Sequence, residues 1–146
     1  MDEKICIDTD ASIAIMKGEP KAENLSDLIG SGKLFASSVT VFELYLRKEN
    51  LQEVTSFLDG IFILDFDEEC AVKASNIQKE LKIKGMQLEL RDIFIASTAI
   101  INNCPPSPIK NSIFNTHSLL LNIIIHSSKK IFCSQSFRSF RNFRKN

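Results

Sequence analysis

The sequence predicts an α/β domain with a mostly parallel sheet, and three observations support this fold class. Short apolar runs at residues 5–7, 34–36 and 61–64 are typical of buried strands. The segments between them carry apolar residues at helical spacing. Caps and turn residues separate the two kinds of segment, which is the pattern of strands joined by helices in a parallel sheet.

Six helices are expected, each from its own start and stop signals. Asp8 to Ser12 offer N-caps for the first helix, Pro20 can occupy the first turn of the second, and Asp67 suits the start of the fifth. The expected helices cover residues 13–16, 20–29, 41–48, 51–59, 67–85 and 92–101. With 146 residues, of which 44% are hydrophobic and 25% charged, the chain can bury the core of one globular domain.

The charges are divided unevenly along the chain, although the formal net charge is zero. Residues 1–92 hold all 18 acids and 11 Lys or Arg, a balance of −7, whereas residues 93–146 hold 7 Lys or Arg and no acid, a balance of +7. An acidic body is therefore followed by a basic tail. Any site built from carboxylates must be complete by Asp92.

Composition argues against a zinc site and against export. The four cysteines include no Cys-x-x-Cys pair and only two histidines accompany them, so we expect reduced thiols. The start of the chain has no basic and apolar leader, and the apolar run 119–125 is too short to span a bilayer. These features predict a cytoplasmic protein that does not contact membranes.

Three carboxylates occupy positions from which they could meet at one cleft. Asp8 follows the first strand, Glu43 lies in the first turn of a helix, and Asp92 opens the last helix. Ligands of open α/β sheets bind beyond the carboxyl ends of the parallel strands. Crowded carboxylates repel one another and need a compensating cation, and oxygen ligands suit Mg²⁺ or Mn²⁺.

Each carboxylate also has a purely structural interpretation. Thr40 and Glu43 have the spacing of a capping box, in which Glu43 would bond back to the Thr40 backbone. Asp92 and Asp10 could serve as helix N-caps, and Asp8 could stabilise a turn. These alternatives remain open at the level of sequence.

Taken together, three segments resemble the PIN domain, and within it the VapC-type ribonuclease toxins of prokaryotic toxin–antitoxin pairs. They are Ile-Cys-Ile-Asp-Thr-Asp at 5–10, Ser-Val-Thr-Val-Phe-Glu-Leu at 38–44 and Asp-Ile-Phe-Ile-Ala at 92–96. Their order and spacing match the family's first Asp, its Thr-x-x-Glu helix and its Asp-x-x-x-Ala helix. The resemblance covers residues 3 to about 104 and implies a three-layer sandwich, with a central, mostly parallel sheet flanked by helices.

The resemblance implies an endoribonuclease that depends on Mg²⁺ or Mn²⁺ and hydrolyses RNA phosphodiesters with metal-activated water. Asp8, Glu43 and Asp92 would be its catalytic, metal-binding carboxylates, and the Thr9 and Thr40 hydroxyls would support them. Its partners would be RNA, a cognate VapB-like antitoxin and a second copy of the chain in a homodimer. The alternative is a catalytically inactive PIN-like module that still binds antitoxin or RNA.

After residue 104 the sequence departs from the family's pattern. We expect a PIN-like domain at 1–104 and an atypical basic segment at 105–146 that is poorly ordered. Prolines at 105, 106 and 108 disfavour a central strand, and the family's fourth polar or acidic site residue is missing. A shifted reading frame would account for the change. With suitable synonymous codons, the stretch that encodes residues 107–117 can be read in another frame as Thr-Asn-Lys-Glu-Leu-Asn-Phe-Gln-His. The repeated Phe-Arg pairs of the tail could alternatively bind single-stranded RNA.

Overall fold

The structure is a computed structural model that describes residues 4–105 and residue 107. Its strands are β1 (Ile5–Ile7), β2 (Leu34–Ser37) and β3 (Phe62–Leu64). Its helices are α1 (Thr9–Met16), the short 3₁₀ helix η1 (Pro20–Ala22), α2 (Glu23–Ser26), α3 (Ser38–Tyr45), α4 (Leu51–Leu58), α5 (Glu68–Ile83) and α6 (Leu90–Ile101).

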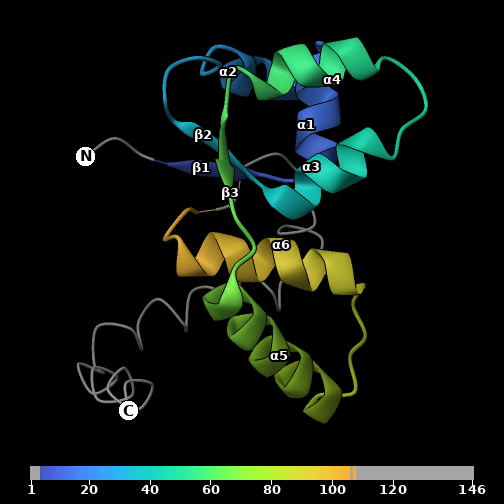
Figure 1. Ribbon diagram of the computed structural model, residues 1–146, viewed down its shortest axis with the longest axis vertical. Coiled ribbons are helices and arrows are strands. Elements are labelled where there is room, and N and C mark those ends of the chain that lie inside the picture. The colour runs from blue at the N-terminus through green and yellow to red at the C-terminus, as the bar shows by residue number, and fades with distance from the viewer. Residues whose placement is uncertain (1–3, 106, 108–146) are drawn as a thin grey trace, which may run out of the picture.

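The three strands form one parallel sheet in the order β1-β2-β3, as Figure 1 shows. Cys6 pairs with Phe35 on β2, and Phe35 pairs with Phe62 on β3. Each strand is followed by at least one helix before the next strand begins, so every connection is a crossover. The predicted α/β fold with a parallel sheet is confirmed.

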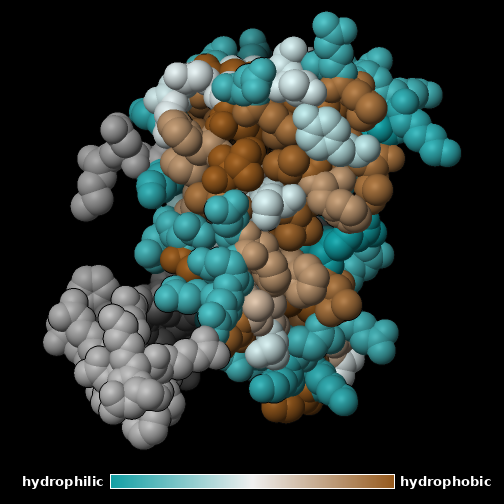
Figure 2. Space-filling view, in the orientation of Figure 1, coloured by the Kyte–Doolittle hydropathy of each residue, from teal (hydrophilic) through white to brown (hydrophobic). Residues whose placement is uncertain are grey.

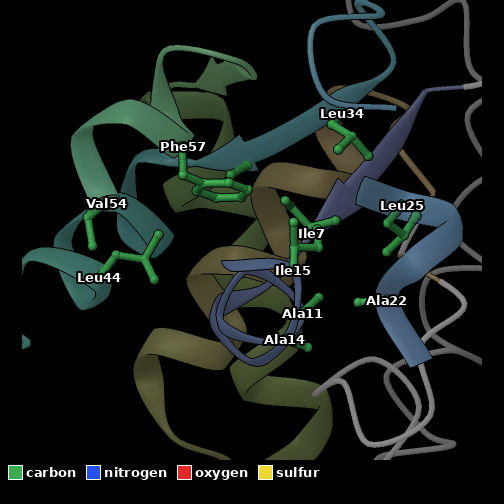
Figure 3. Close-up of a cluster of buried hydrophobic side chains, with 11 residues drawn as sticks. Ile7, Ala11, Ala14, Ile15, Ala22, Leu25, Leu34, Leu44, Val54 and Phe57 are labelled. Atoms are coloured by element: carbon green, nitrogen blue, oxygen red, sulfur yellow. The ribbon is translucent and has the colours of Figure 1, made fainter. Parts of the chain in front are cut away.

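Helices cover both faces of the sheet, which gives three layers (Figure 1). Successive strand residues point to opposite faces, so Ile7 packs with α1 to α4 whereas its neighbour Cys6 packs with α5 and α6. Figure 3 shows the first of these cores, where side chains from β1, β2 and the four helices meet. This burial on two faces explains why β1 and β2 are almost wholly apolar.

Side-chain caps fix where several helices begin. The Asp67 carboxylate accepts the Cys70 N–H at 2.9 Å, which confirms the predicted start of α5 and lowers the pKa of Asp67. The Ser37 hydroxyl accepts the Thr40 N–H at 3.0 Å at the start of α3. Thr40 therefore lies inside α3, and the capping-box interpretation of Thr40 and Glu43 is wrong.

The second predicted helix is shorter than the sequence suggested. Instead of one helix over 20–29, the chain forms η1 and the four-residue α2. Leu25 is buried as expected, but Ile29 is 40% exposed because the chain has already left the helix. Spacing therefore identified Leu25 and Leu28 as core residues correctly and Ile29 wrongly, because the helix ends before it reaches position 29.

The chain beyond α6 pairs with the outer edge of β1. The Cys6 N–H donates to the Pro105 carbonyl at 2.7 Å, and the Ser107 N–H donates to the Cys6 carbonyl at 2.8 Å. These are the two bonds that one residue makes to a parallel neighbour. The prolines had argued against such pairing, but the bonds use a carbonyl and a serine N–H, neither of which proline removes. Residues 108–146, which include the predicted basic tail, lie outside the described residues.

The described cysteines, Cys6, Cys70 and Cys104, are free and buried, as predicted; Cys133 lies outside the described residues. A hydrogen bond with the Cys104 thiol, together with burial, raises the pKa of Cys6. The Cys6 and Cys104 side chains both belong to the apolar core on the α5–α6 side, where they serve as small apolar groups.

The third strand presents apolar side chains to solvent. Phe62 is 56% exposed and stacks on Phe35 with ring centroids 5.4 Å apart, and Ile63 is 41% exposed. Figure 2 shows apolar residues gathered on this face of the molecule, over the area where β3 and α4 lie in Figure 1.

None of the helices that the structure describes has the length and apolar character needed to cross a membrane.

Candidate active site

One pocket of about 350 Å³ opens where β1, α1, α3 and the start of α6 come together. Its wall holds four carboxylates, two guanidinium groups and one hydroxyl. The polar lining residues are Asp8, Thr9, Asp10, Glu43, Arg47, Arg91 and Asp92. Leu46 and Ile95 complete the wall. The three sequence-predicted carboxylates thus share one cavity at the carboxyl end of β1.

Asp8 is the most enclosed of these carboxylates, with 1% of its surface exposed. It is the N-cap of α1, where its Oδ1 accepts the Ala11 N–H at 2.8 Å. The Ser12 hydroxyl donates to the Asp8 carbonyl at 2.7 Å and holds the same turn. The positive end of α1 favours the charged carboxylate. The structural interpretation of Asp8 and its position in the pocket are therefore compatible.

Glu43 projects from α3 with its two carboxylate oxygens held by different partners. The Thr9 hydroxyl, at the start of α1, donates to Oε2. Arg91 Nη1, at the start of α6, lies 3.3 Å from Oε1. The side chain of Glu43 is only 15% exposed, so both contacts are partly shielded from solvent. Three helices are joined through this single carboxylate.

Asp92 lies in the first turn of α6, half-buried, on the pocket wall. The N-cap of this helix is Glu89, three residues earlier, so the interpretation of Asp92 as an N-cap is wrong. Asp10 is likewise no cap, since Asp8 caps α1 and Asp10 is exposed in the first turn. Both residues are thus placed on the pocket without a capping role.

Of the two hydroxyls expected to support the carboxylates, Thr9 lies in the pocket and Thr40 does not. Thr40 is fully buried, with its Oγ1 3.2 Å from the Ser37 hydroxyl at the end of β2. From this position Thr40 contributes to the junction of β2 and α3, the helix that carries Glu43.

Sequence reasoning overlooked the two arginines of the pocket, Arg47 and Arg91. Arg47 falls near the C-terminal end of the expected helix 41–48, where a positive charge already has a structural explanation. Arg91 directly precedes Asp92, so its place one residue before a proposed ligand was the available signal. The spacing along the chain could not show that it reaches Glu43 on another helix.

The donor set of the pocket suits a hard divalent cation, because four carboxylates supply oxygen ligands in a site with too little positive charge of its own. Their present positions do not yet form a coordination shell. Among the residues that the structure describes, no three His, Cys, Asp or Glu side chains are grouped closely enough to hold a metal ion. Glu43, held by Thr9 and Arg91, is one carboxylate whose oxygens are already engaged.

The sequence matches the PIN domain over residues 5–106. The chain therefore belongs to the PIN domain family. Within it, the chain resembles ribonucleases of the VapC type: it is 35% identical to ribonuclease VapC2 of Haemophilus influenzae over 104 residues, covering 66% of this chain and 78% of that protein. It is 30% identical to ribonuclease VapC1 of Methanocaldococcus jannaschii, covering 71% of this chain and 74% of that protein.

The fold is also similar to that of VapBC toxin–antitoxin complexes. The DNA-bound VapBC structure from Salmonella typhimurium superposes with a TM-score of 0.61 at 25% identity, covering 70% of this chain and 83% of that chain. The parallel sheet and its two helical layers are thus the PIN arrangement. The matched region ends at residue 106, within the segment that pairs with β1.

Proposed function

We propose that this protein is a metal-dependent endoribonuclease that hydrolyses RNA phosphodiesters at the pocket lined by Asp8, Glu43 and Asp92. The observation that carries the proposal is the convergence of these carboxylates, from three separate elements, on one pocket in a PIN domain. The names of its VapC relatives support the reaction class. The substrate is RNA rather than DNA by the same likeness.

The carboxylates of Asp8, Glu43 and Asp92 would hold Mg²⁺ or Mn²⁺, with Asp10 at the rim of the same pocket. The bound cation would supply Lewis-acid activation of water and of the phosphodiester. Asp8 is fixed by the α1 backbone, and Thr9 orients Glu43 by donating to Oε2. Hydrogen bonds of this kind, from residues that do not bind the metal themselves, keep metal ligands in place. Their loss commonly lowers metal affinity or activity by about 10- to 100-fold.

The test is cleavage of single-stranded RNA by the purified chain with and without Mn²⁺ or Mg²⁺, comparing wild type with Asp8→Asn. Asn keeps the size and the capping ability of Asp but removes the charge. We expect the wild type to cleave only with the cation and the variant to lose about 100-fold or more of the rate, because a charged ligand is lost. Cleavage that survives Asp8→Asn would show that the activity comes from another protein.

A second candidate is a PIN-like module that binds RNA or antitoxin without cutting. Two observations favour it: both carboxylate oxygens of Glu43 are engaged, and no three carboxylates among the described residues lie close enough together to hold a metal ion. Metal binding separates the two candidates. A chain that binds RNA but neither Mn²⁺ nor Mg²⁺ in calorimetry would be the inactive module.

We further propose a VapB-like antitoxin and a homodimer as the protein's assemblies. The similarity to VapBC complexes supports the antitoxin. The exposed apolar side chains of β3 and α3, among them Phe62 and Phe42, supply surface for protein contacts. Native mass spectrometry of the chain, alone and co-expressed with a small protein encoded beside its gene, tests both.

A further inference from the structure

Arg91 makes two ion pairs that differ in character. Its Nη2 lies 3.0 Å from Glu89 Oε2, two residues earlier in the chain, and its Nη1 lies 3.3 Å from Glu43 Oε1 on α3. The Glu89 side chain is 70% exposed, whereas that of Glu43 is 15% exposed and faces the pocket. Arg91 therefore pairs with an exposed carboxylate outside the pocket through one nitrogen and with a pocket carboxylate through the other.

Two contacts hold the Glu43 carboxylate, one from Thr9 and one from Arg91. The contact from Arg91 is the easier one to exchange. Thr9 is half-buried and occupies Oε2, so it remains compatible with a cation bound at Oε1. Arg91 is 46% exposed, and its pairing with Glu43 is longer than that with Glu89. Because the guanidinium end of this pair is open to solvent, water can replace Glu43 as its partner, and a pair with one exposed member contributes modest free energy.

A divalent cation would compete with the Arg91 guanidinium for Glu43, because both are positive and Oε1 is the oxygen that Thr9 leaves available. If Arg91 left Glu43, its planar group would have N–H donors that suit a phosphate oxygen, and its position in the first turn of α6 would keep it at the pocket wall. The carboxylates of the pocket repel an RNA phosphate, so a positive side chain at this point offsets that repulsion.

We propose that Arg91 is a substrate-positioning residue that exchanges partners: it neutralises Glu43 in the metal-free site and binds an RNA phosphate when Glu43 takes the cation. This inference rests on the proposed nuclease function and adds the order in which cation and RNA bind. It also explains why a residue one position before Asp92 reaches across to a different helix.

The test measures cation and RNA binding separately in the full-length chain. Mn²⁺ affinity is measured by calorimetry without RNA, and RNA affinity by fluorescence anisotropy of a 2′-O-methyl oligonucleotide, which resists cleavage, at saturating Mn²⁺. Arg91→Gln removes the exchanging charge. Arg47→Gln removes an equal charge from the same pocket, where Arg91 and not Arg47 pairs with Glu43. Arg91→Lys retains the charge and loses the planar fork.

Arg91→Gln is expected to bind Mn²⁺ about two- to fivefold more tightly, as one competing exposed ion pair is removed. The same variant is expected to bind RNA more weakly, with the slope of log affinity against log salt reduced by about 0.7 for the lost phosphate contact. Arg47→Gln should change Mn²⁺ affinity by less than half as much. Arg91→Lys should keep wild-type Mn²⁺ affinity and fall between wild type and Arg91→Gln for RNA.

Opposite movement of the two affinities is the outcome that a merely structural role cannot produce. Parallel loss of both affinities in Arg91→Gln, with an unchanged melting temperature, would overturn the exchange, as would an unchanged salt slope. If the wild type binds Mn²⁺ but does not cleave RNA, the nuclease proposal fails while these binding measurements still decide the role of Arg91. If the wild type binds no Mn²⁺, both proposals are overturned.

Discussion

Asp8 carries two roles in one side chain, because its carboxylate accepts the Ala11 N–H and also lines the pocket. Removing the cap and removing the charge can be separated by two substitutions. Asp8→Ala should lower the free energy of unfolding by about 1 kcal/mol, since Ala cannot cap α1, whereas Asp8→Asn should cost much less. Urea denaturation followed by circular dichroism measures both values.

Equal destabilisation by the two substitutions would contradict this account of the cap. It would mean that the charge of Asp8, rather than its hydrogen bond to the start of α1, stabilises the fold. A natural comparison is Asp10→Asn, because Asp10 lines the same pocket but is exposed and does not cap α1. This variant should leave the unfolding midpoint close to that of the wild type.

At the residue scale, sequence reasoning reached the carboxylates of the pocket and not their partners. Strand ends and first helical turns are local features, so Asp8, Glu43 and Asp92 could be singled out from the sequence. The contact of Arg91 with Glu43 joins two helices 48 positions apart in the chain and depends on how α3 and α6 pack. No local pattern encodes that packing.

At the scale of single elements, α5 ends in a turn that requires a left-handed residue. Gly85 has φ of 68°, and the next amide, that of Met86, donates to the Leu81 carbonyl at 2.9 Å. A side chain at position 85 meets no neighbouring atom, so strain in the backbone is the whole effect of adding one. Gly85→Ala should therefore lower the free energy of unfolding by about 1 kcal/mol.

Thermal denaturation of Gly85→Ala tests this turn, and Gln78→Ala on the exposed side of α5 provides the matched control. Gln78→Ala keeps helical backbone and should change the stability by a few tenths of a kcal/mol, roughly. A Gly85→Ala variant as stable as the wild type would mean that α5 can end in another way.

The elements themselves were largely predictable, and the errors share one cause. All three strands and the later helices follow from apolar runs and periodicity, with ends shifted by a few residues. The α6 helix begins at Leu90 instead of Asp92, and α3 at Ser38 instead of Val41. The sequence suggested Thr40 and Asp92 as the N-caps of these helices. The N-caps are instead the residues three positions earlier, Ser37 and Glu89. Several polar residues in a row make the choice of cap ambiguous.

At the scale of the whole molecule, the sheet extends beyond its three strands through the bonds between Cys6 and residues 105 and 107. The prolines at 105, 106 and 108 disfavour a central strand at this point of the sequence. The sequence alone could not tell which backbone groups would face β1, because that depends on register. The observed register uses the Ser107 N–H and the Pro105 carbonyl, so the proline-rich sequence does not prevent it.

This pairing should support β1, the strand that leads into Asp8. Ser107→Pro removes the N–H that donates to the buried Cys6 carbonyl and leaves that carbonyl unsatisfied. An unpaired buried backbone group costs about 1–3 kcal/mol, so the free energy of unfolding should fall by about that amount. Ser107→Ala keeps the N–H and changes only the side chain, which makes it the matched control. Urea denaturation of the two variants gives the comparison, and hydrogen exchange of the Cys6 amide reports whether the edge has opened. Equal stability of the two variants would show that the bond from Ser107 adds nothing to the sheet. A loss of stability in Ser107→Pro alone would show that the segment after α6 completes the sheet whose first strand leads into Asp8.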